Sequence, residues 1–323
     1  MTALVSINLI VHRDFTHIYG ALRSLFETTA LRPLEVQVII NVGDPAEVER
    51  LRQAFPDVTI VVNPQPLGFA ANHNAFMRTA QTPYVALLND DLTLHAGALD
   101  AMIAYMEAHP RVGLAGAALL NPDGTPQVSV YGDPRLPLTL YKISGLSSLT
   151  AEGTALRRTL EKLNRGRVIK VESWVEQART REVPVVKGAV MVVRRAAYEE
   201  VGLMDESTRV YGEEIDWHLR FRRAGWQVVM IAEAKITHHG IGQRITLSNL
   251  VEDRAALLNY YLKHRPRWQG ETVRASLIAF HGLRAAAWLP FDRTRSAAHL
   301  RVVRMARAWR VADVSAAADR AGR

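Results

Sequence analysis

A chain of 323 residues is long enough for one large domain, or for one domain with an appendage, and its 48% hydrophobic and 22% charged residues exclude an extended disordered protein. The absence of cysteine excludes disulfide bonds and thiolate chemistry. The net charge of +8 favours polyanionic partners, such as nucleic acid, anionic lipid or phosphorylated substrates.

The first 120 residues alternate between short apolar runs and segments in which apolar residues have helical spacing. The apolar runs predict strands, at 4–11, 34–42, 58–63, 84–89 and 112–120. The segments between them predict helices, at 17–30, 45–55, 69–80 and 96–109. This alternation indicates a mostly parallel sheet with helices on both faces. In such sheets ligands bind beyond the carboxyl ends of the strands.

After residue 120 the pattern weakens. The sequence NPDGTPQ, at 121–127, predicts a hairpin-like turn, and prolines make 131–142 irregular. The basic, amphipathic segment 149–167 predicts a helix. Strand and helix patterns then return, with strands at 183–195 and 226–239 and helices at 195–202 and 211–225. From about residue 247 onward the chain has helical patterns in two or three segments.

Three polar residues stand at the end of the strand predicted at 84–89: Asn89, Asp90 and Asp91. Neighbouring carboxylates repel one another, and oxygen ligands of this kind hold hard divalent cations. The alternative is that Asp90 or Asp91 caps a helix beginning near Leu94. Taken alone, the triplet favours capping.

A second polar segment runs from Asn63 to Phe76. It follows a strand, contains Gly68 in a turn, and opens a helix whose N-terminus can hold an anion or a polar ring. The alternative is an ordinary loop followed by a helix with buried amides, in which His73 is structural.

Two further blocks carry acidic and imidazole groups. Glu213, Glu214 and Asp216 lie within one helical turn, where a carboxylate can act as a general base or simply suit the N-terminus of a surface helix. His238 and His239 end a strand and point to opposite faces. One of these two histidines could complete a metal site with a remote aspartate, although such a pair is more often structural.

Together and in this order, these four blocks resemble glycosyltransferase family 2, the inverting nucleotide-sugar enzymes of the GT-A fold. The strongest part is VKGAVMVVRRAAYEEVGLMDESTRVYGEEIDWHLRFRRAGW, at 186–226. LGFAANHNAF, at 67–76, is similar to a loop of the family, and LLNDDL, at 87–92, occupies its DxD position. Among subgroups the chain looks most like the rhamnosyltransferase type.

The resemblance implies an α/β fold, namely a Rossmann-like, mostly parallel sheet flanked by helices, with a C-terminal helical extension. It implies a GT-A catalytic domain at 1–245 and a basic, amphipathic helical region at 246–323. Within the catalytic domain it implies a nucleotide-sugar half at 1–120 and an acceptor half at 121–245.

The resemblance also implies roles for single residues. Asp91 would bind a divalent cation, Mg²⁺ or Mn²⁺, that bridges the diphosphate of the donor, with His238 as a second ligand. Glu214 would be the general base, while Glu213 and Asp216 would position the acceptor or a loop.

Donor and acceptor contacts follow from the same resemblance. The residues implied for donor binding are Asn41, Asp44, Gly68, Phe69, Asn74, Asn89 and Asp90. Those implied for acceptor binding are Gly188, Ala189 and Trp217.

The chain departs from the family at NVGDPAE, at 41–47, where an Asp-Asn-Ser-type turn is common. HRPRW, at 264–268, lacks the glutamine of the processive synthases, so transfer of a single sugar is expected.

The function implied is transfer of one hexosyl or deoxyhexosyl unit from a nucleotide-sugar to a glycan or a lipid-linked glycan, in the synthesis of bacterial cell-surface polysaccharide or glycolipid. A non-catalytic nucleotide-sugar-binding protein of the same fold is the alternative. Nucleic acid is not an expected partner, because aromatic and basic residues are not interleaved. The expected location is the cytoplasm, where a peripheral position on the inner face of the plasma membrane is an open alternative. A homodimer is a second open alternative.

The C-terminal segment 300–312 predicts an amphipathic helix. Its apolar side contains Val302, Ala306 and Trp309, and arginines occupy the other half. Such a helix can lie on an anionic membrane. Packing on the catalytic domain or on a subunit partner is at least as good an interpretation.

Overall fold

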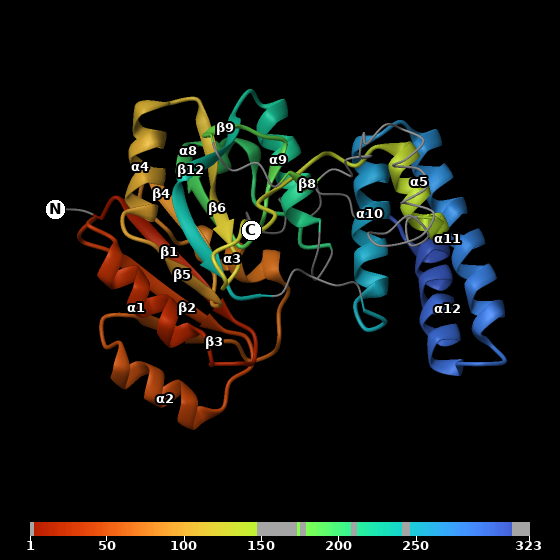
Figure 1. Cartoon of the computed structure of the whole chain (residues 1–323), viewed down its shortest axis with the longest axis horizontal. Coiled ribbons are helices and arrows are strands. Elements are labelled where there is room, and N and C mark those ends of the chain that lie inside the picture. The colour runs from red at the N-terminus through yellow and green to blue at the C-terminus, as the bar shows by residue number, and fades with distance from the viewer. Residues whose placement is uncertain (1–2, 147–172, 175–178, 208–211, 241–245, 312–323) are drawn as a thin grey trace, which may run out of the picture. The chain divides into compact units, whose positions relative to one another are not determined.

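The computed structural model of the protein describes residues 3–146, 173–174, 179–207, 212–240 and 246–311 (Figure 1). The chain divides into two compact units. The first, here called the sheet unit, contains 1–133, 172–209 and 213–243. The second, here called the helical unit, contains 134–171, 210–212 and 244–323. The helix predicted at 149–167 lies outside the described residues.

A mixed, mostly parallel sheet forms the centre of the sheet unit. Its strands follow the order β3-β2-β1-β4-β11-β6-β12-β5, and β9 pairs with β12. The bounds are β1 Val5–Val11, β2 Glu35–Ile40, β3 Thr59–Val62, β4 Tyr84–Asn89, β5 Leu92–Leu94, β6 Val112–Leu120, β9 Arg181–Glu182, β11 Val190–Arg194 and β12 Gln227–His238. The first four strands of that order and the β6–β12 pair are parallel, whereas β11 runs antiparallel between β4 and β6. The predicted α/β architecture is confirmed.

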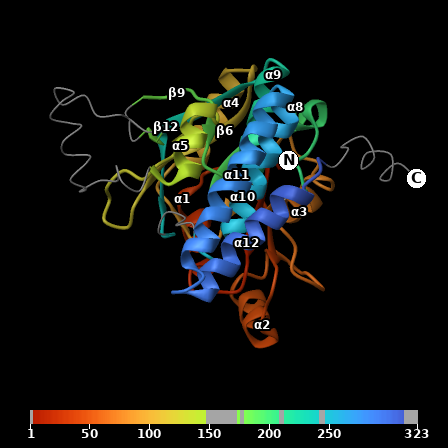
Figure 2. The same ribbon diagram turned by 90° about the vertical axis from the view of Figure 1, so that its right-hand side faces the viewer.

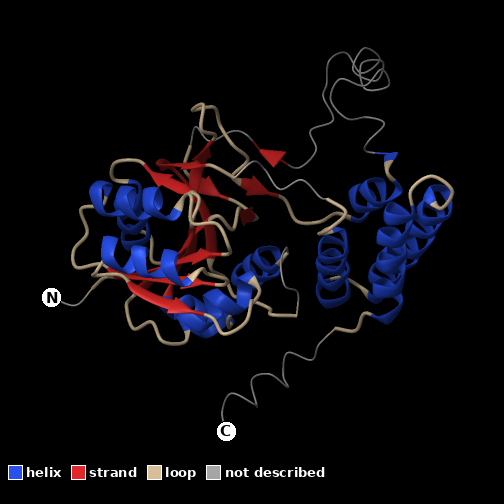
Figure 3. Ribbon diagram, turned by 90° about the horizontal axis from the view of Figure 1, so that it is seen from below, coloured by secondary structure: helices blue, strands red, loops and turns tan. Residues whose placement is uncertain are grey.

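Helices cover both faces of this sheet (Figure 3). One face packs against α1, Ile18–Thr28, α2, Pro45–Ala54, and α4, Ala98–Ala108. The other packs against α3, Phe69–Met77, α8, Arg195–Val201, and α9, Glu213–Arg223. Alternation along β4 separates the two layers, because successive side chains of a strand point to opposite faces. Ala86 and Leu88 belong to the first layer, and Val85 and Leu87 to the second.

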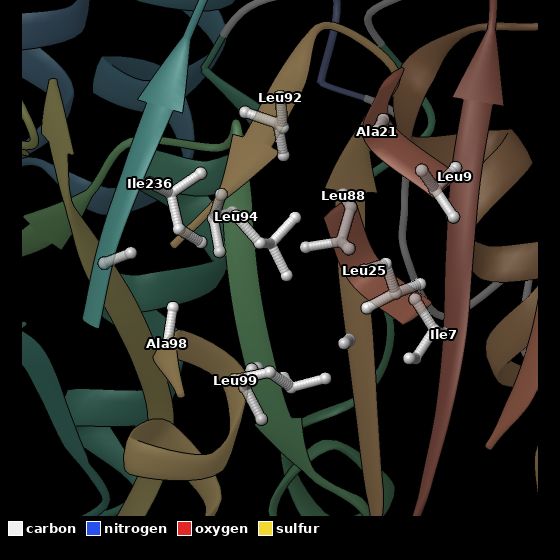
Figure 4. Packing of buried hydrophobic residues seen from close by; sticks show 14 of the residues in the cluster. Ile7, Leu9, Ala21, Leu25, Leu88, Leu92, Leu94, Ala98, Leu99 and Ile236 are labelled. Carbon is white, nitrogen blue, oxygen red and sulfur yellow. The ribbon is translucent and has the colours of Figure 1, made fainter. Parts of the chain in front are cut away.

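The core of the first layer contains side chains from strands that are far apart in the sequence. Figure 4 shows leucines and isoleucines from β1, β4, β5 and β12 on the side of the sheet that α1 and α4 cover. The labelled side chains are Ile7, Leu9, Ala21, Leu25, Leu88, Leu92, Leu94, Ala98, Leu99 and Ile236. Burial of such aliphatic groups is the main favourable term in folding.

The segment after Asp91 differs from the helix that capping would require. Residues Leu92–Leu94 form β5, which pairs antiparallel with β12, and α4 begins only at Ala98 after Gly97 in the left-handed region. The prediction of a helix beginning near Leu94 is therefore wrong. Leu92 and Leu94 are buried, so hydrophobic packing of this short strand explains why the chain stays extended.

The described residues between 120 and 190 form mostly short elements. The hairpin turn predicted at 121–127 is confirmed by a bridge between Leu120 and Pro126 and by Gly124 in the left-handed region. A second sheet joins β10, β7 and β8 in that order. Its strands are β7 Val130–Tyr131, β8 Ser173–Trp174 and β10 Val185–Val186.

The helical unit contains α5, Leu136–Ser144, α10, Leu250–His264, α11, Arg267–Trp288, and α12, Arg293–Ala308, which pack along one another (Figure 2). The sequence predicts irregular chain at 131–142, but residues from Leu136 onward form α5, so this part of the prediction is wrong. Pro137 stands in the first turn, where N–H groups have no partner within the helix, so its missing N–H costs no hydrogen bond. The helices expected after residue 247 are confirmed.

The amphipathic character of α12 is satisfied within the helical unit. Val302 and Ala306 are fully buried, and the indole of Trp309 donates to Asn259 Oδ1 at 3.3 Å. The described part of the chain contains no helix with both the length and the apolar character needed to cross a bilayer. The apolar side of α12 is therefore used for packing on its own neighbours.

Gly116 of β6 tests the packing of the sheet. A Cβ atom there would lie 2.5 Å from Cβ of Val186, so Gly116→Ala is expected to lower the free energy of unfolding by about 1–3 kcal/mol through overpacking. Gly20→Ala is the matched control, because the space around this exposed position on α1 is open and alanine should add about 0.5–1 kcal/mol. Urea unfolding measures both, and equal stability of the two variants would contradict the packing described.

Candidate active site

The pairing of β5 with β12 brings Asp91 and His238 together. His238 stands opposite Leu92 in this antiparallel pair, and the backbone N–H of His239 donates to the carbonyl of Asp91 at 2.8 Å. As a result His238 Nε2 lies 3.4 Å from Asp91 Oδ1. The two residues predicted as metal ligands, 147 positions apart in the sequence, are therefore neighbours.

The surroundings of this pair fit a divalent cation. Asp91 Oδ1 is buried and has no hydrogen-bond partner in the described part of the chain. A Cβ atom at Gly240 would lie 2.6 Å from Asp91 Oδ2 and 3.0 Å from His238 Nε2, so only glycine leaves this space open. A carboxylate oxygen and an imidazole nitrogen are suitable ligands for Mn²⁺ or Mg²⁺.

The protein offers few further ligands there. Among the described residues no three or more histidine and carboxylate side chains gather around one point. Magnesium sites in particular often use one or two carboxylates and take other ligands from substrate phosphates and water. His239 turns away, since its ring stacks on His17 and its Nε2 lies 2.9 Å from Thr93 Oγ1. Of the two histidines, only His238 faces Asp91.

Two residues that the sequence analysis did not single out stand beside the pair. Lys187 Nζ lies 2.7 Å from Gln127 Oε1, and both residues approach the ring of His238. Burial lowers the pKa of Lys187, and the charge of Asp91 opposes that shift. The lysine could have been found, because it immediately precedes Gly188 in the strongest block of the sequence. Nothing in the sequence pointed to Gln127.

Asn89 and Asp90 complete the end of β4. The backbone N–H of Asn89 donates to the carbonyl of Ala189 at 3.0 Å, which ties β4 to the start of β11. Burial, followed by the charge of Asp91, raises the pKa of Asp90 to about 7, and Asp14 adds to the same effect. This edge of the sheet is thus a place where negative charge is poorly solvated. Ala189 is itself buried.

Phe69, Gly188 and Glu214 converge near the start of α9. The Cβ position of Gly188 is 3.8 Å from the ring of Phe69 and 3.9 Å from Cβ of Glu214. Tyr131 is close enough to Glu214 to feel its charge. Burial, and then the charge of Glu214, raises the pKa of the Tyr131 phenol to about 12. Three residues predicted separately from the sequence therefore meet at one place, and Tyr131 was missed.

Glu213 differs from its neighbour in burial. Its side chain is buried, and Oε2 has no hydrogen-bond partner among the described residues. Burial, and then the charge of Glu214, raises the pKa of Glu213 to about 8. Glu213 is therefore harder to ionise than an ordinary glutamate. Glu214 is half-buried.

Asp216 and Trp217 hold α9 in place. Asp216 is buried and accepts from Arg220 Nε at 2.8 Å, and the same guanidinium donates to the carbonyls of Val201 and Leu203. These bonds attach α9 to the loop after α8. Trp217 is fully buried, so the structure gives it a packing position and no surface for an acceptor.

Two asparagines predicted for donor binding are buried hydrogen-bonding centres. Asn41 donates to the carbonyl of Leu67 at 2.8 Å and accepts from the N–H of Leu67 at 2.7 Å, which fixes the loop before α3. Asn74 donates to the carbonyl of Met204 at 2.9 Å and accepts from the N–H of the same residue. Both side chains shape loops at this edge of the sheet.

Helix N-termini account for two other predicted positions. The side chain of Asp44 accepts from the N–H groups of Ala46 and Glu47 and so caps α2. Gly68 is the residue before α3, and no side chain caps that helix. The start of α3 therefore keeps N–H groups for a polar ligand, as the loop pattern suggested.

Comparison with known proteins gives a family match over most of the chain. Residues 20–271 match the family model described as Glycosyltransferase like family 2. The chain is 25% identical over 250 residues to the N-acetylglucosaminyl-diphospho-decaprenol L-rhamnosyltransferase of Mycobacterium tuberculosis, an alignment that covers 74% of this chain and 77% of the relative.

Solved structures show the same fold. The mannosyltransferase PcManGT from Pyrobaculum calidifontis, in complex with GDP-Man and Mn²⁺, matches with a TM-score of 0.53 and 15% identity over 95% of this chain and 88% of that one. GalNAc-T7 with UDP, GalNAc and Mn²⁺ matches with a TM-score of 0.52 and 12% identity. That match covers 84% of this chain, which spans only 54% of the length of GalNAc-T7.

Glu213 predicts a pH dependence of stability. Its pKa is raised on folding, so its stabilising effect is complete below its ordinary value of 4.5 and is lost as the pH rises through about 8. Glutamine cannot ionise, so Glu213→Gln does not lose this stability. The free energy of unfolding of the variant relative to that of the native protein should therefore rise by at least about 1 kcal/mol when the pH is raised from 5 to 8.5. Urea unfolding at both pH values measures this difference.

The exposed Glu199→Gln on α8 is the control and should keep the native pH dependence. A Glu213→Gln variant whose stability followed that of the native protein at all pH values would show that Glu213 ionises normally.

Proposed function

The chain belongs to glycosyltransferase family 2, and from this we propose that it moves one sugar from a nucleotide-sugar to an acceptor hydroxyl with inversion at the anomeric carbon. What supports the proposal is that the neighbouring side chains of Asp91 and His238, which suit a cation, stand just beyond the end of β4 and at the end of β12, and that a separate carboxylate, Glu214, stands at the start of α9. Lys187 and Gly188, adjacent in sequence, connect the two. We also propose that 1–120 binds the donor and that 121–245 carries most acceptor contacts.

The first task of the site is to accept a departing nucleoside diphosphate. A divalent cation, when bound, supplies positive charge that stabilises this leaving group. Asp91 and His238 would hold the cation, and Asp90 would contact the donor sugar or ribose. Lys187 adds a fixed positive charge close by, which is the kind of preorganised electrostatic support that a charged transition state needs.

The second task is to activate the acceptor. Glu214 accepts the proton of the acceptor hydroxyl, whose oxygen attacks the anomeric carbon from the face opposite the nucleotide. Glu213 is less suited to this role because its carboxyl is buried, whereas that of Glu214 is half-buried. General base catalysis of this kind contributes about 10²–10⁴-fold.

The name of the mycobacterial relative suggests the substrates. A deoxyhexose donor of the rhamnose type and an acceptor attached to a lipid through a diphosphate are the substrates we propose. They agree with the net charge of +8, because both substrates carry diphosphates. Release of nucleoside diphosphate across a panel of UDP-, GDP- and dTDP-sugars, with and without Mn²⁺, identifies the donor.

A lipid-linked acceptor needs a way to meet the enzyme, and we propose that the connection between α11 and α12 contacts the membrane. Leu289 and Phe291 in this connection are exposed by 59% and 82%, and Leu283, in the last turns of α11, is exposed by 68%. Arg293 and Arg295 follow at once. Exposed apolar side chains beside arginines are typical of surfaces that lie on anionic lipid. The sequence offers the apolar side of α12 as a membrane contact. That side is buried, and we propose the α11–α12 connection in its place.

The general base is tested by Glu214→Gln. Because glutamine cannot accept the proton, sugar transfer should fall by about 10²–10⁴-fold while donor binding, measured by calorimetry, stays close to native. Glu199→Gln on α8 is the control and should transfer normally. A Glu214→Gln enzyme with undiminished turnover would remove Glu214 from this role.

The membrane surface is tested by flotation with vesicles of neutral lipid alone or mixed with anionic lipid. The native protein should float with the anionic vesicles, and the double variant Leu289→Ser, Phe291→Ser should lose most of this binding. Val61→Ser, which replaces an exposed valine of the sheet unit, is the control. Equal flotation of the double variant and the native protein would exclude this surface.

A further inference from the structure

Gln127 has an orientation that its neighbours determine. Its side-chain Nε2 lies 3.1 Å from the carbonyl of His238, 3.4 Å from the carbonyl of Gly240 and 3.0 Å from Asn121 Oδ1. Backbone carbonyls can only accept hydrogen bonds, so the amide group that faces them must be the NH₂. The oxygen of Gln127 therefore points the other way. The hairpin at 121–127 brings the residue to this position.

The oxygen of Gln127 in turn determines a proton on His238. Gln127 Oε1 lies 2.6 Å from His238 Nδ1 and 2.7 Å from Lys187 Nζ. An amide oxygen only accepts, and two acceptors do not approach to 2.6 Å without a proton between them. His238 Nδ1 must therefore donate. Lys187 Nζ, which can only donate, lies at the longer distance of 3.3 Å from the same nitrogen, so its hydrogen bond is the one of 2.7 Å to Gln127 Oε1, which holds that oxygen in place.

A neutral imidazole has one protonated nitrogen and one lone pair. With the proton on Nδ1, the lone pair of His238 is on Nε2, which lies 3.4 Å from Asp91 Oδ1. That oxygen is buried and has no hydrogen-bond partner in the described part of the chain. With Nε2 unprotonated, two electron-pair donors face one another across the space that Gly240 keeps open, which is the arrangement that a cation requires.

We propose that Gln127 is a positioning residue of the cation site, which holds His238 in the Nδ1-protonated tautomer so that Nε2 is free to bind the metal. The proposal rests on the proposed function for the metal, but the tautomer itself is a property of the metal-free protein. Residues that orient a metal-binding histidine in this way typically change metal affinity by about 10–100-fold when they are replaced.

The tautomer is tested first, in the full-length metal-free protein labelled with ¹⁵N-histidine. Long-range ¹H–¹⁵N correlation spectra distinguish the two neutral tautomers and the doubly protonated ring, and comparison with His238→Gln assigns the signal. We expect the Nδ1-protonated form in the native protein. In Gln127→Met, which keeps a side chain of similar length without the amide, we expect the Nε2-protonated form or a mixture.

The second measurement is Mn²⁺ binding, followed by the loss of the free-ion signal in electron paramagnetic resonance. Gln127→Met should bind Mn²⁺ about 10–100-fold more weakly than the native protein. The matched control is Gln53→Met, at an exposed position on α2, which should bind like the native protein. Circular dichroism of each variant confirms that it is folded before the affinities are compared.

The possible failures are distinguishable. A native protein with the Nε2-protonated or doubly protonated His238 would overturn the role of Gln127 whatever the metal result, and so would native Mn²⁺ affinity in Gln127→Met. A native protein that has the expected tautomer but does not bind Mn²⁺ would overturn the metal in the proposed function and with it the purpose assigned to Gln127.

Discussion

The antiparallel pairing between β5 and β12 is the interaction on which the candidate active site depends. β5 has only three residues, and buried leucines hold it in place. This pairing sets the register that puts His238 beside Asp91, and a shift by one residue would present His239 instead, because strand side chains alternate between faces. The hydrogen bond from the N–H of His239 to Asp91 continues the same ladder. Hydrophobic packing at the sheet edge thus positions polar chemistry.

Poorly solvated carboxyl groups distinguish this edge from an ordinary strand end. Asp90 and Glu213 both have raised pKa values, and burial is the largest cause in each. A fold can keep such groups only if function or neighbouring charges offset their effect on stability. Lys187 provides one positive charge beside Asp91, and a bound cation would provide another. Glu213 is buried and Glu214 is half-buried, so the two adjacent glutamates differ in solvation.

The loops around the site are held by side chains to which the family resemblance assigned donor binding, acceptor binding or the positioning of a loop. Asn41 and Asn74 bond to backbone groups of loops. Asp216 accepts from Arg220, whose guanidinium donates to the carbonyls of Val201 and Leu203, and Trp217 is the buried residue by which α9 packs. These side chains satisfy polar groups of the loops, which holds the loops in place. The sequence motifs of the family thus include residues that hold loops in place.

The sequence by itself determined the alternation of strands and helices, the edge of the sheet where the candidate site lies and the blocks from which the family could be recognised. It could do so because apolar periodicity and turn residues act over short distances along the chain. Only the tertiary structure decided that β5 replaces a helix start, that His238 and not His239 faces Asp91, and that Gln127 joins them. These outcomes depend on strand register and on hydrogen bonds between residues more than a hundred positions apart, as in the 111-residue separation of Gln127 and His238. No local pattern of residues encodes such a contact.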